Sequence, residues 1–240
     1  MPADKLLEAY EKFLSETFLN YRFAEGLLKP LDFTASDARQ FCFFLEKYAD
    51  HQWFKQTGYF ISALANRVLE KEREMRLGLG KLGAKMDFIG NRLSRGRLVV
   101  EGDVGDHAGL EMFGGDFEVT GSAGNYLGDS MIGGRIAVHG SAGDFAGVEM
   151  KGGQIAIAGS AGKCLARTMR NGMITVGGDA GEYACWFMAA GLVTVKGSAG
   201  LNAGQSMAGG ELRVMGEIKG ISPYFQRGRI FNKGKLVMAK

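Results

Sequence analysis

Acidic side chains that could serve as catalytic acids or bases recur at one outward position of a glycine-rich repeat. Carboxylates grouped on such a surface would suit the hydrolysis or elimination of an acidic polysaccharide. The residues at this position are Asp106, Asn125, Asp144, Lys163, Glu182 and Leu201. Because their chemistry changes from one repeat to the next, they do not supply a fixed set of base, nucleophile and oxyanion donor. We therefore interpret the position as solvated surface and predict no catalytic residue.

Residue types that bind metals are present but are not grouped. The sequence contains three histidines and three cysteines: His51, His107, His139, Cys42, Cys164 and Cys185. The histidines occupy different repeat positions or lie outside the repeat, and the cysteines have neither a CxxC spacing nor an even number. Apolar neighbours such as Phe41, Phe43 and Trp186 indicate that the cysteines are buried free thiols. We expect neither a metal nor another cofactor to bind to this chain.

Glycine-rich strings could form a phosphate-binding loop. Such a loop occurs once in a domain, between a strand and a helix, whereas here the strings recur in each repeat. We interpret their glycines as structural turn residues and predict a positive φ for them, because only glycine adopts it without a Cβ penalty. These residues are Gly102, Gly105, Gly109, Gly121, Gly124, Gly128, Gly140, Gly143, Gly147, Gly159, Gly162, Gly178, Gly181, Gly197, Gly200 and Gly204.

A nineteen-residue period positions all of these side chains. The pairs that begin at Gly114, Gly133, Gly152 and Gly209 are separated by multiples of nineteen. The repeat reads G-G-x-Φ-x-V-x-G-S-A-G-x-x-x-G-x-x-M-x, where Φ is a large apolar residue. Its Φ and V positions are two residues apart in a short β-branched run, which predicts a strand with one face inward.

Five positions of the repeat each keep one kind of apolar side chain. They begin at Leu98, Val100, Val104, Ala108 and Met112 and recur nineteen residues apart. The last of them continues as Met131, Met150, Met169, Met188 and Met207. Stacked coils would bury all five positions in a continuous core. The predicted fold is therefore mainly β, a single-stranded parallel β-helix of nineteen-residue coils, and the general rule for parallel crossovers predicts a right-handed coil.

The amino-terminal third lacks this period and is predicted to be helical. Apolar residues at a spacing of three to four predict a helix from Leu6 to Phe18 and another from about Trp53 through Val68 into the charged stretch Glu70–Glu74. Between them, Ser36 is the expected cap of a further helix. Three helices suffice for a small bundle.

These patterns divide the chain into four segments. We predict a small helical domain over residues 1–78, a linker over 79–85, the β-helix over 86–234 and a carboxy-terminal tail over 235–240. The open ends of a β-helix need to be covered to prevent edge pairing. The helical domain is the expected cover of the first coil.

One outward position is unusually apolar for a surface. It is occupied by His107, Tyr126, Phe145, Cys164, Tyr183 and Asn202. Such a stripe either stacks upon itself or contacts a partner. Nearby, Ala166 and Cys185 replace the fourth glycine of the repeat, and Arg167, Trp186 and Phe187 follow them. These residues are typical of a protein–protein hot spot, although compensating repacking explains them equally well. The candidate partner contacts are Tyr126, Phe145, Arg167, Tyr183, Trp186 and Phe187.

Charge and hydropathy argue against nucleic acid and membranes as partners. The 240 residues include 29 basic and 26 acidic ones, for a formal net charge of +3, which is too balanced for either surface. No stretch approaches the roughly 18 consecutive apolar residues of a membrane span, and the amino terminus has no apolar run behind basic residues. We expect a cytoplasmic protein whose partners are other protein subunits.

The glycine pattern resembles the GXGXG-motif β-helix family. That family includes the β-helix subunit of formylmethanofuran dehydrogenase and the carboxy-terminal domain of the glutamate synthase large subunit. The resemblance rests on strings such as Gly121–Gly124 and on Met150 before the pair Gly152–Gly153. The methionine favours the formylmethanofuran dehydrogenase subunit, since leucine at this position is associated with glutamate synthase. The resemblance implies a subunit that holds catalytic partners in place and has no chemistry of its own.

Three functions follow from these observations. The first is a scaffold or assembly subunit of an oxidoreductase or formyl-transfer complex of C1 metabolism, whose partner subunits carry a tungsten- or molybdenum-pterin, iron–sulfur clusters or zinc. The second is the β-helix component of a glutamate-synthase-like amidotransferase, with FMN and iron–sulfur clusters on its partners. The third and weakest is an autonomous hydrolase or lyase. The helical domain, which departs from the formylmethanofuran dehydrogenase pattern, is a candidate surface for a homo-oligomer.

Overall fold

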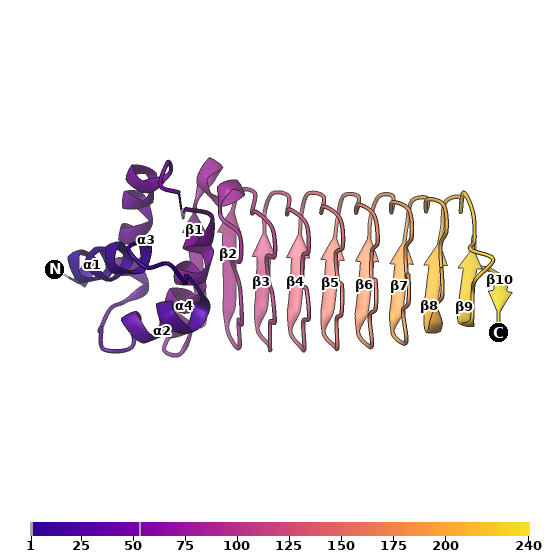
Figure 1. The fold of residues 1–240 in the computed structure, drawn as a ribbon, viewed down its shortest axis with the longest axis horizontal. Coiled ribbons are helices and arrows are strands. Elements are labelled where there is room, and N and C mark those ends of the chain that lie inside the picture. Colours follow the sequence, from indigo (N-terminus) through magenta and orange to yellow (C-terminus); the bar gives the residue numbers. More distant parts are fainter. Residues whose placement is uncertain (1, 53) are drawn as a thin grey trace.

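The molecule is a rod with a helical region at one end. The computed structural model describes residues 2–52 and 54–240. Parallel strands stand side by side along the rod, and the helices gather at its amino-terminal end (Figure 1). The strands form one ten-stranded sheet in the order of the sequence. The parallel β-helix predicted from the repeat is therefore confirmed.

The described part of the helical region contains four α-helices. They are α1 (Pro2–Leu14), α2 (Tyr21–Leu28), α3 (Ala35–Phe44) and α4 (Thr57–Leu69), with short 3-10 helices η1 (Leu45–Tyr48) and η2 (Phe54–Gln56) between α3 and α4. The sequence interpretation missed α2, which is only eight residues long. It also extended the first helix too far, because Phe18 lies beyond α1 and its side chain is 84% exposed. Trp53, the expected start of the last helix, lies outside the described residues, and this helix ends at Leu69 rather than within the charged stretch Glu70–Glu74.

Thr34, rather than the predicted Ser36, caps α3. Its hydroxyl accepts a hydrogen bond from the backbone N–H of Asp37 at 3.2 Å, and the Asp37 carboxylate accepts one from the backbone N–H of Thr34 at 2.9 Å. This reciprocal pair is a capping box, which satisfies two backbone donors at once. The helices then pack around buried aromatic rings, such as Tyr10 against Phe41 and Phe60.

Each coil of the rod contributes one short strand. The strands are β1 (Glu74–Gly78), β2 (Arg97–Glu101), β3 (Asp116–Val119), β4 (Arg135–Val138), β5 (Gln154–Ile157), β6 (Met173–Val176), β7 (Leu192–Val195), β8 (Ala208–Val214), β9 (Arg227–Asn232) and β10 (Lys235–Ala239). From β2 to β8 the pairing is parallel, and each residue pairs with the one nineteen positions later, as Val119 does with Val138. The predicted register is thus the observed one.

The five repeating apolar positions fill the interior. Along β3 to β6 the burial pattern alternates, with Φ and V buried between more exposed neighbours. All six repeat methionines, from Met112 to Met207, have 0% exposed surface. They are core residues, as predicted. Alanines of the third position, such as Ala142 and Ala161, form single parallel bridges between successive coils.

The sheet extends past the predicted limits of the β-helix at both ends. β1 falls within the segment predicted to be helical and pairs in parallel with β2, and the 3-10 helix η3 (Gly80–Lys85) occupies the predicted linker. At the other end, β10 occupies most of the predicted tail and pairs antiparallel with β9. The helices α3 and α4 contact β1, so the helical region covers the first coil.

The predicted positive φ explains some of the turn glycines, and most of them are needed for a different reason. Positive φ is found at five of the sixteen, namely Gly102, Gly109, Gly128, Gly147 and Gly204, and not at the other eleven. At the eleven, a Cβ atom would collide with the preceding coil. For Gly143 it would lie 2.4 Å from Asn125 Oδ1 and 2.9 Å from Gly124 C. The close approach of two backbones, rather than left-handed geometry, excludes side chains there.

Candidate interaction surface

An aromatic ladder runs along the outside of the rod, beginning in the helical region. Rings of Tyr59, Phe88, His107, Tyr126 and Phe145 stack in this order at centroid separations of 4.2, 5.1, 4.6 and 4.9 Å. Successive rings are tilted by no more than 14°. Stacked pairs of this kind contribute about 0.5–1.5 kcal/mol each beyond their burial. Of the two predicted explanations for the outward stripe, self-stacking therefore holds for this part of it.

The rings sit on left-handed backbone. From Phe88 to Phe145 the four ladder residues on the coils have φ between 56° and 69°, a conformation that L side chains rarely adopt. Hydrogen bonds to the next coil stabilise it, because the N–H of His107 donates to the carbonyl of Asn125 and that of Tyr126 to Asp144, both at 2.8 Å. The outward stripe is thus fixed by the coil geometry itself.

The ladder is interrupted where Cys164 replaces an aromatic residue, and Arg167 fills the space. The guanidinium carbon of Arg167 lies 5.9 Å from the ring centroid of Phe145 and 4.5 Å from that of Trp186. Trp186 in turn packs against Phe187 and Tyr183, with centroids 5.5 and 5.7 Å apart. An arginine between two rings gains about 0.5–2 kcal/mol from each cation–π contact.

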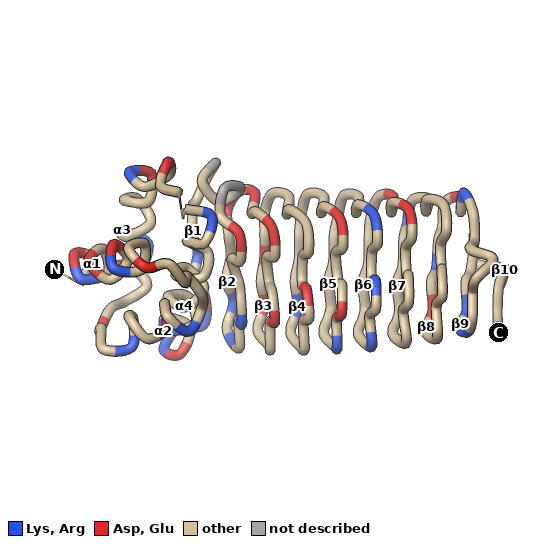
Figure 2. Tube along the Cα trace, in the orientation of Figure 1, with Lys and Arg blue, Asp and Glu red and all other residues tan. Residues whose placement is uncertain are grey.

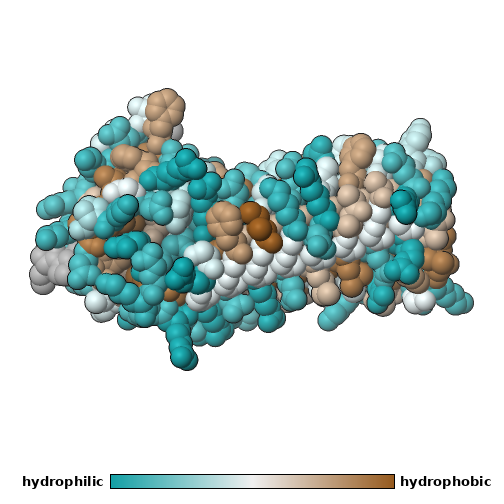
Figure 3. Space-filling model, turned by 90° about the horizontal axis from the view of Figure 1, so that it is seen from below, coloured by the Kyte–Doolittle hydropathy of each residue, from teal (hydrophilic) through white to brown (hydrophobic). Residues whose placement is uncertain are grey.

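All six predicted partner contacts therefore join in one row, which we call the aromatic strip: Tyr126, Phe145, Arg167, Tyr183, Trp186 and Phe187. Phe187 is 46% exposed. In the view of Figure 3, exposed apolar side chains form separate groups along the rod among hydrophilic ones. Exposed aromatic groups beside an arginine are typical of binding hot spots.

Two buried polar atoms in the strip lack partners. Nε of Arg167 and the indole Nε1 of Trp186 form no hydrogen bond within the described part of the chain. The backbone around them is strained as well, because Ala166 and Cys185 keep φ values of 57° and 62° at positions where other coils have glycine. Each such residue costs on the order of 1–3 kcal/mol, and strain of this kind often gathers at functional sites.

The outward carboxylate position has a structural role. Asp106 Oδ1 accepts a hydrogen bond from the backbone N–H of Asn125 at 2.7 Å, Asn125 Oδ1 from Asp144 at 2.8 Å and Asp144 Oδ1 from Lys163 at 2.7 Å. A second row does the same through Asp103, Ser122, Ser141, Ser160, Asp179 and Ser198. Each acceptor satisfies a donor of the next coil, so these side chains tie coils together.

Substitution of Asp144 tests this role. Asp144→Ala removes the acceptor for the N–H of Lys163 and should lower the free energy of unfolding by about 1 kcal/mol. Asp144→Asn should change it by only a few tenths, because Asn125 makes the same bond one coil earlier. Urea unfolding of both variants measures the difference. An Asn variant as unstable as the Ala variant would show that the charge, and not the acceptor, matters.

The cysteines are buried thiols, and His107 and His139 contact other side chains. All three thiols are free and buried, and burial raises the pKa of Cys42 to about 12 and also raises the pKa values of Cys164 and Cys185. Protonated thiols are poor nucleophiles. His107 belongs to the ladder, and Nε2 of His139 lies 3.2 Å from Glu118. In the part of the chain that the structure describes, no three His, Cys, Asp or Glu side chains group as a metal site.

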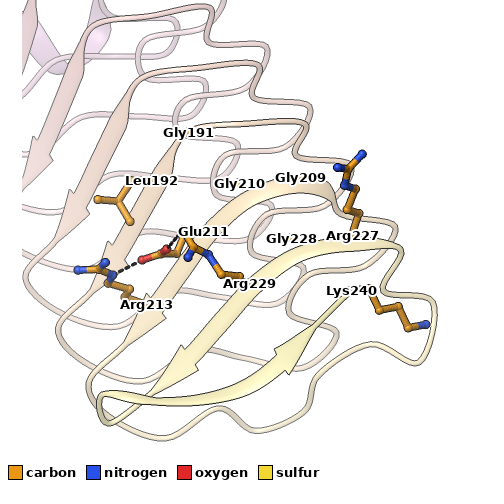
Figure 4. A pocket seen from close by; sticks show the side chains of 10 residues that line it. All are labelled: Gly191, Leu192, Gly209, Gly210, Glu211, Arg213, Arg227, Gly228, Arg229 and Lys240. Carbon is orange, nitrogen blue, oxygen red and sulfur yellow. Dashed lines mark hydrogen bonds and ion pairs between the residues drawn. The ribbon is translucent and has the colours of Figure 1, made fainter.

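A basic cleft of about 450 Å³ lies near the carboxy-terminal end of the rod. Both signs of charge are spread over the molecule (Figure 2), but four cationic side chains line this cleft: Arg213, Arg227, Arg229 and Lys240. Figure 4 shows Arg213 and Arg229 directed at the carboxylate of Glu211, whereas Arg227 points away from it. Glu211, which is only 8% exposed, forms ion pairs with both. This single carboxylate compensates only part of the positive charge of the four cationic side chains.

Sequence reasoning missed two features of this surface. The ladder continues to Phe88, which the period could have revealed because it lies nineteen residues before His107. The first ring of the ladder, Tyr59, lies on α4 outside the repeat and has no sequence signal. The hydrogen-bonded row that begins at Asp103 was visible as a column of short acceptors, Asp or Ser, whose role depends on the distance between coils.

Comparisons with known proteins found no matching family model and no matching curated protein. Among residues 2–52 and 54–240, the structure contains no helix with the length and apolar character needed to cross a membrane.

Proposed function

We propose that this chain is a non-catalytic scaffold subunit of a multi-subunit enzyme complex and that a partner subunit binds on the aromatic strip. The observation that carries the proposal is the strip itself, in which six residues from successive coils make one continuous outward row that ends at the exposed Phe187. Aromatic side chains that the coil holds in a fixed position lose little conformational entropy when a partner binds.

The outward polar side chains support a scaffold over a hydrolase. Asp106, Asn125 and Asp144 are engaged by backbone donors of the next coil, and a carboxylate that holds the coils together is poorly placed to exchange protons with a substrate. A rod with a repeating core is well suited to present partners at a fixed spacing.

The finer proposal is a complex similar to formylmethanofuran dehydrogenase. Its support is the glycine repeat together with the buried methionine before the Gly-Gly pair. The partner subunits would then carry a tungsten- or molybdenum-pterin, iron–sulfur clusters or zinc. Purification of the tagged chain from its native organism, followed by metal and flavin analysis, tests this. Tungsten or molybdenum supports the proposal, whereas FMN would point to a glutamate-synthase-like amidotransferase.

Substitution of Phe187 tests the docking surface. Phe187→Asn should reduce the amount of co-purified partner at least tenfold, because it removes the exposed end of the strip. Asparagine tolerates the left-handed φ of 56° at this position, so the fold should be unaffected. Quantitative mass spectrometry of the purified complex measures the loss.

A matched control is Phe113→Asn, since Phe113 is 49% exposed, close to the 46% of Phe187, but lies outside the strip. It should leave the partner bound. Equal loss in both variants, or loss in neither, would contradict docking on the aromatic strip.

A further inference from the structure

We infer that Arg167 is a receptor for a carboxylate group of the partner subunit, supplied by an aspartate or glutamate side chain or by a chain terminus. This inference rests on the proposed function, because it names the chemistry of the group that docks on the aromatic strip. It follows from the surroundings of Arg167, which differ from those of the other half-buried arginines in the described residues.

Half-buried arginines elsewhere in the described residues have acidic partners. Arg67 pairs with Glu70 at 3.1 Å and Arg92 with Glu111 at 2.7 Å. Arg97 pairs with Glu74 at 3.1 Å and also with Glu118. Arg167 is equally half-buried, yet within the part of the chain described it forms no ion pair. Its neighbours are the rings of Phe145 and Trp186.

The acidic residues around Arg167 are otherwise engaged or directed elsewhere. Glu182 pairs with Lys163 at 3.2 Å. Glu149 donates its backbone N–H to the carbonyl of Arg167 at 3.0 Å, but its carboxylate is exposed and makes no ion pair with the guanidinium among the described residues. Removing a charge from water without compensation is costly. The chain therefore leaves an unbalanced cation at the centre of its most aromatic surface.

The geometry is that of a preorganised receptor. The two neighbouring rings contact the guanidinium and restrict the rotamers of the Arg167 side chain. Less conformational entropy is therefore lost when a partner binds. A guanidinium offers a planar fork of donors that matches a carboxylate. Nε of Arg167 is buried without an acceptor among the described residues, whereas its two Nη atoms are not among the buried ones, so they are the donors that a partner can reach. The indole Nε1 of Trp186 is likewise buried without an acceptor, so the cluster around Arg167 contains a second unsatisfied donor. The exposed Phe187 provides an apolar rim beside them.

The test uses the assembled complex. A photoreactive benzoylphenylalanine in place of Phe187 is cross-linked in the native complex, and the attached peptide is sequenced. We expect a peptide of another subunit with an acidic residue or a carboxy terminus near the cross-link. Arg167→Lys should then weaken partner binding at least tenfold, since lysine keeps the charge but lacks the planar fork and stacks poorly. Arg170→Lys, an exposed arginine of the same coil, should have no effect.

A double-mutant cycle tests whether Arg167 and the cross-linked acidic residue interact directly. Neutralising the cross-linked acidic residue should weaken binding as much as Arg167→Gln, which removes the charge, and these two changes together should cost no more than either alone. Additive effects, or a cross-linked peptide without a carboxylate, would overturn the inference while leaving docking on the strip intact. A cross-link to a second copy of this chain would overturn it as well. If every variant, Phe187→Asn included, retained its partner, the proposed function would instead be rejected.

Discussion

Gly143→Val is expected to lower the free energy of unfolding by about 1–3 kcal/mol or more. The added Cβ would lie 2.4 Å from Asn125 Oδ1 and 2.9 Å from both Asn125 N and Gly124 C. Two of these atoms are backbone, so the coils must separate. That separation would weaken the hydrogen bonds from the N–H of Gly143 to the carbonyls of Ala123 and Gly124, at 3.2 and 3.1 Å.

Gly78→Val is the matched control for this substitution. Gly78 lies in β1, and a Cβ there would meet only the Glu101 carboxylate, at 3.7 Å. Valine is favoured in strands, so the control should be neutral or slightly stabilising. Urea unfolding of the two variants provides the comparison. If Gly143→Val unfolded at the same urea concentration as the unmodified chain, the close contact between coils would be wrong.

Met150→Ala is expected to cost about 2–5 kcal/mol, the usual range for a large-to-small change in a packed core. Met150 has 0% exposed surface, and its Cε atom lies against Gly172 of the next coil. Coils above and below hold the surrounding side chains in register, so the site has little freedom to collapse around the cavity. Most of the lost packing should therefore appear in the measured stability.

Met173→Ala is the control that separates the effect of burial from the effect of replacing a methionine as such. Met173 belongs to the following coil but is 41% exposed, and its replacement should change stability by less than about 0.5 kcal/mol. Thermal and urea unfolding of both methionine variants measure the difference. Similar losses in the two, or a negligible loss for Met150→Ala, would place the methionine position on the surface of the coil.

The solenoid could be predicted because each repeat has the same pattern of residue types and therefore forms the same coil. Leu98, Phe117 and Ile136 differ in shape but share a position nineteen residues apart, and a core column needs only a large apolar side chain there. The register then follows without knowledge of any single contact, and the pairing of Phe117 with Ile136 confirms it.

Features that depend on distances between coils could not be predicted in this way. Glycine at position 143 is compatible with either positive φ or a close contact, and only coordinates showed that the contact is the cause. Conversely, His107, Tyr126 and Phe145 adopt left-handed backbone, which their residue types do not indicate. The short helix α2 and the contact of Tyr59 with Phe88 depend on packing outside the repeat.

The sequence predicted which residues belong to the group of candidate contacts, but not how their side chains are arranged. Sequence alone left two explanations for the stripe, self-stacking and contact with a partner, and the structure shows self-stacking for one part of it. His107, Tyr126 and Phe145 stack on one another, whereas Arg167 and Trp186 keep polar atoms without partners. A hydrogen-bond deficit of this kind is invisible in a sequence, because it depends on which side chains fail to meet.

Distances between spin labels test the central claim, that side chains nineteen residues apart lie directly above one another along a filled rod. Labels are introduced as cysteines at Thr120 and at one of Ala158, Lys196 or Met215, all exposed and two, four or five coils further on. Labelling of the unmodified chain corrects for its three buried thiols. Coils stacked at about 4.8 Å predict separations near 10, 19 and 24 Å, which rise linearly with coil number. Separations that do not increase with coil number would contradict the stacked register and the surface built on it.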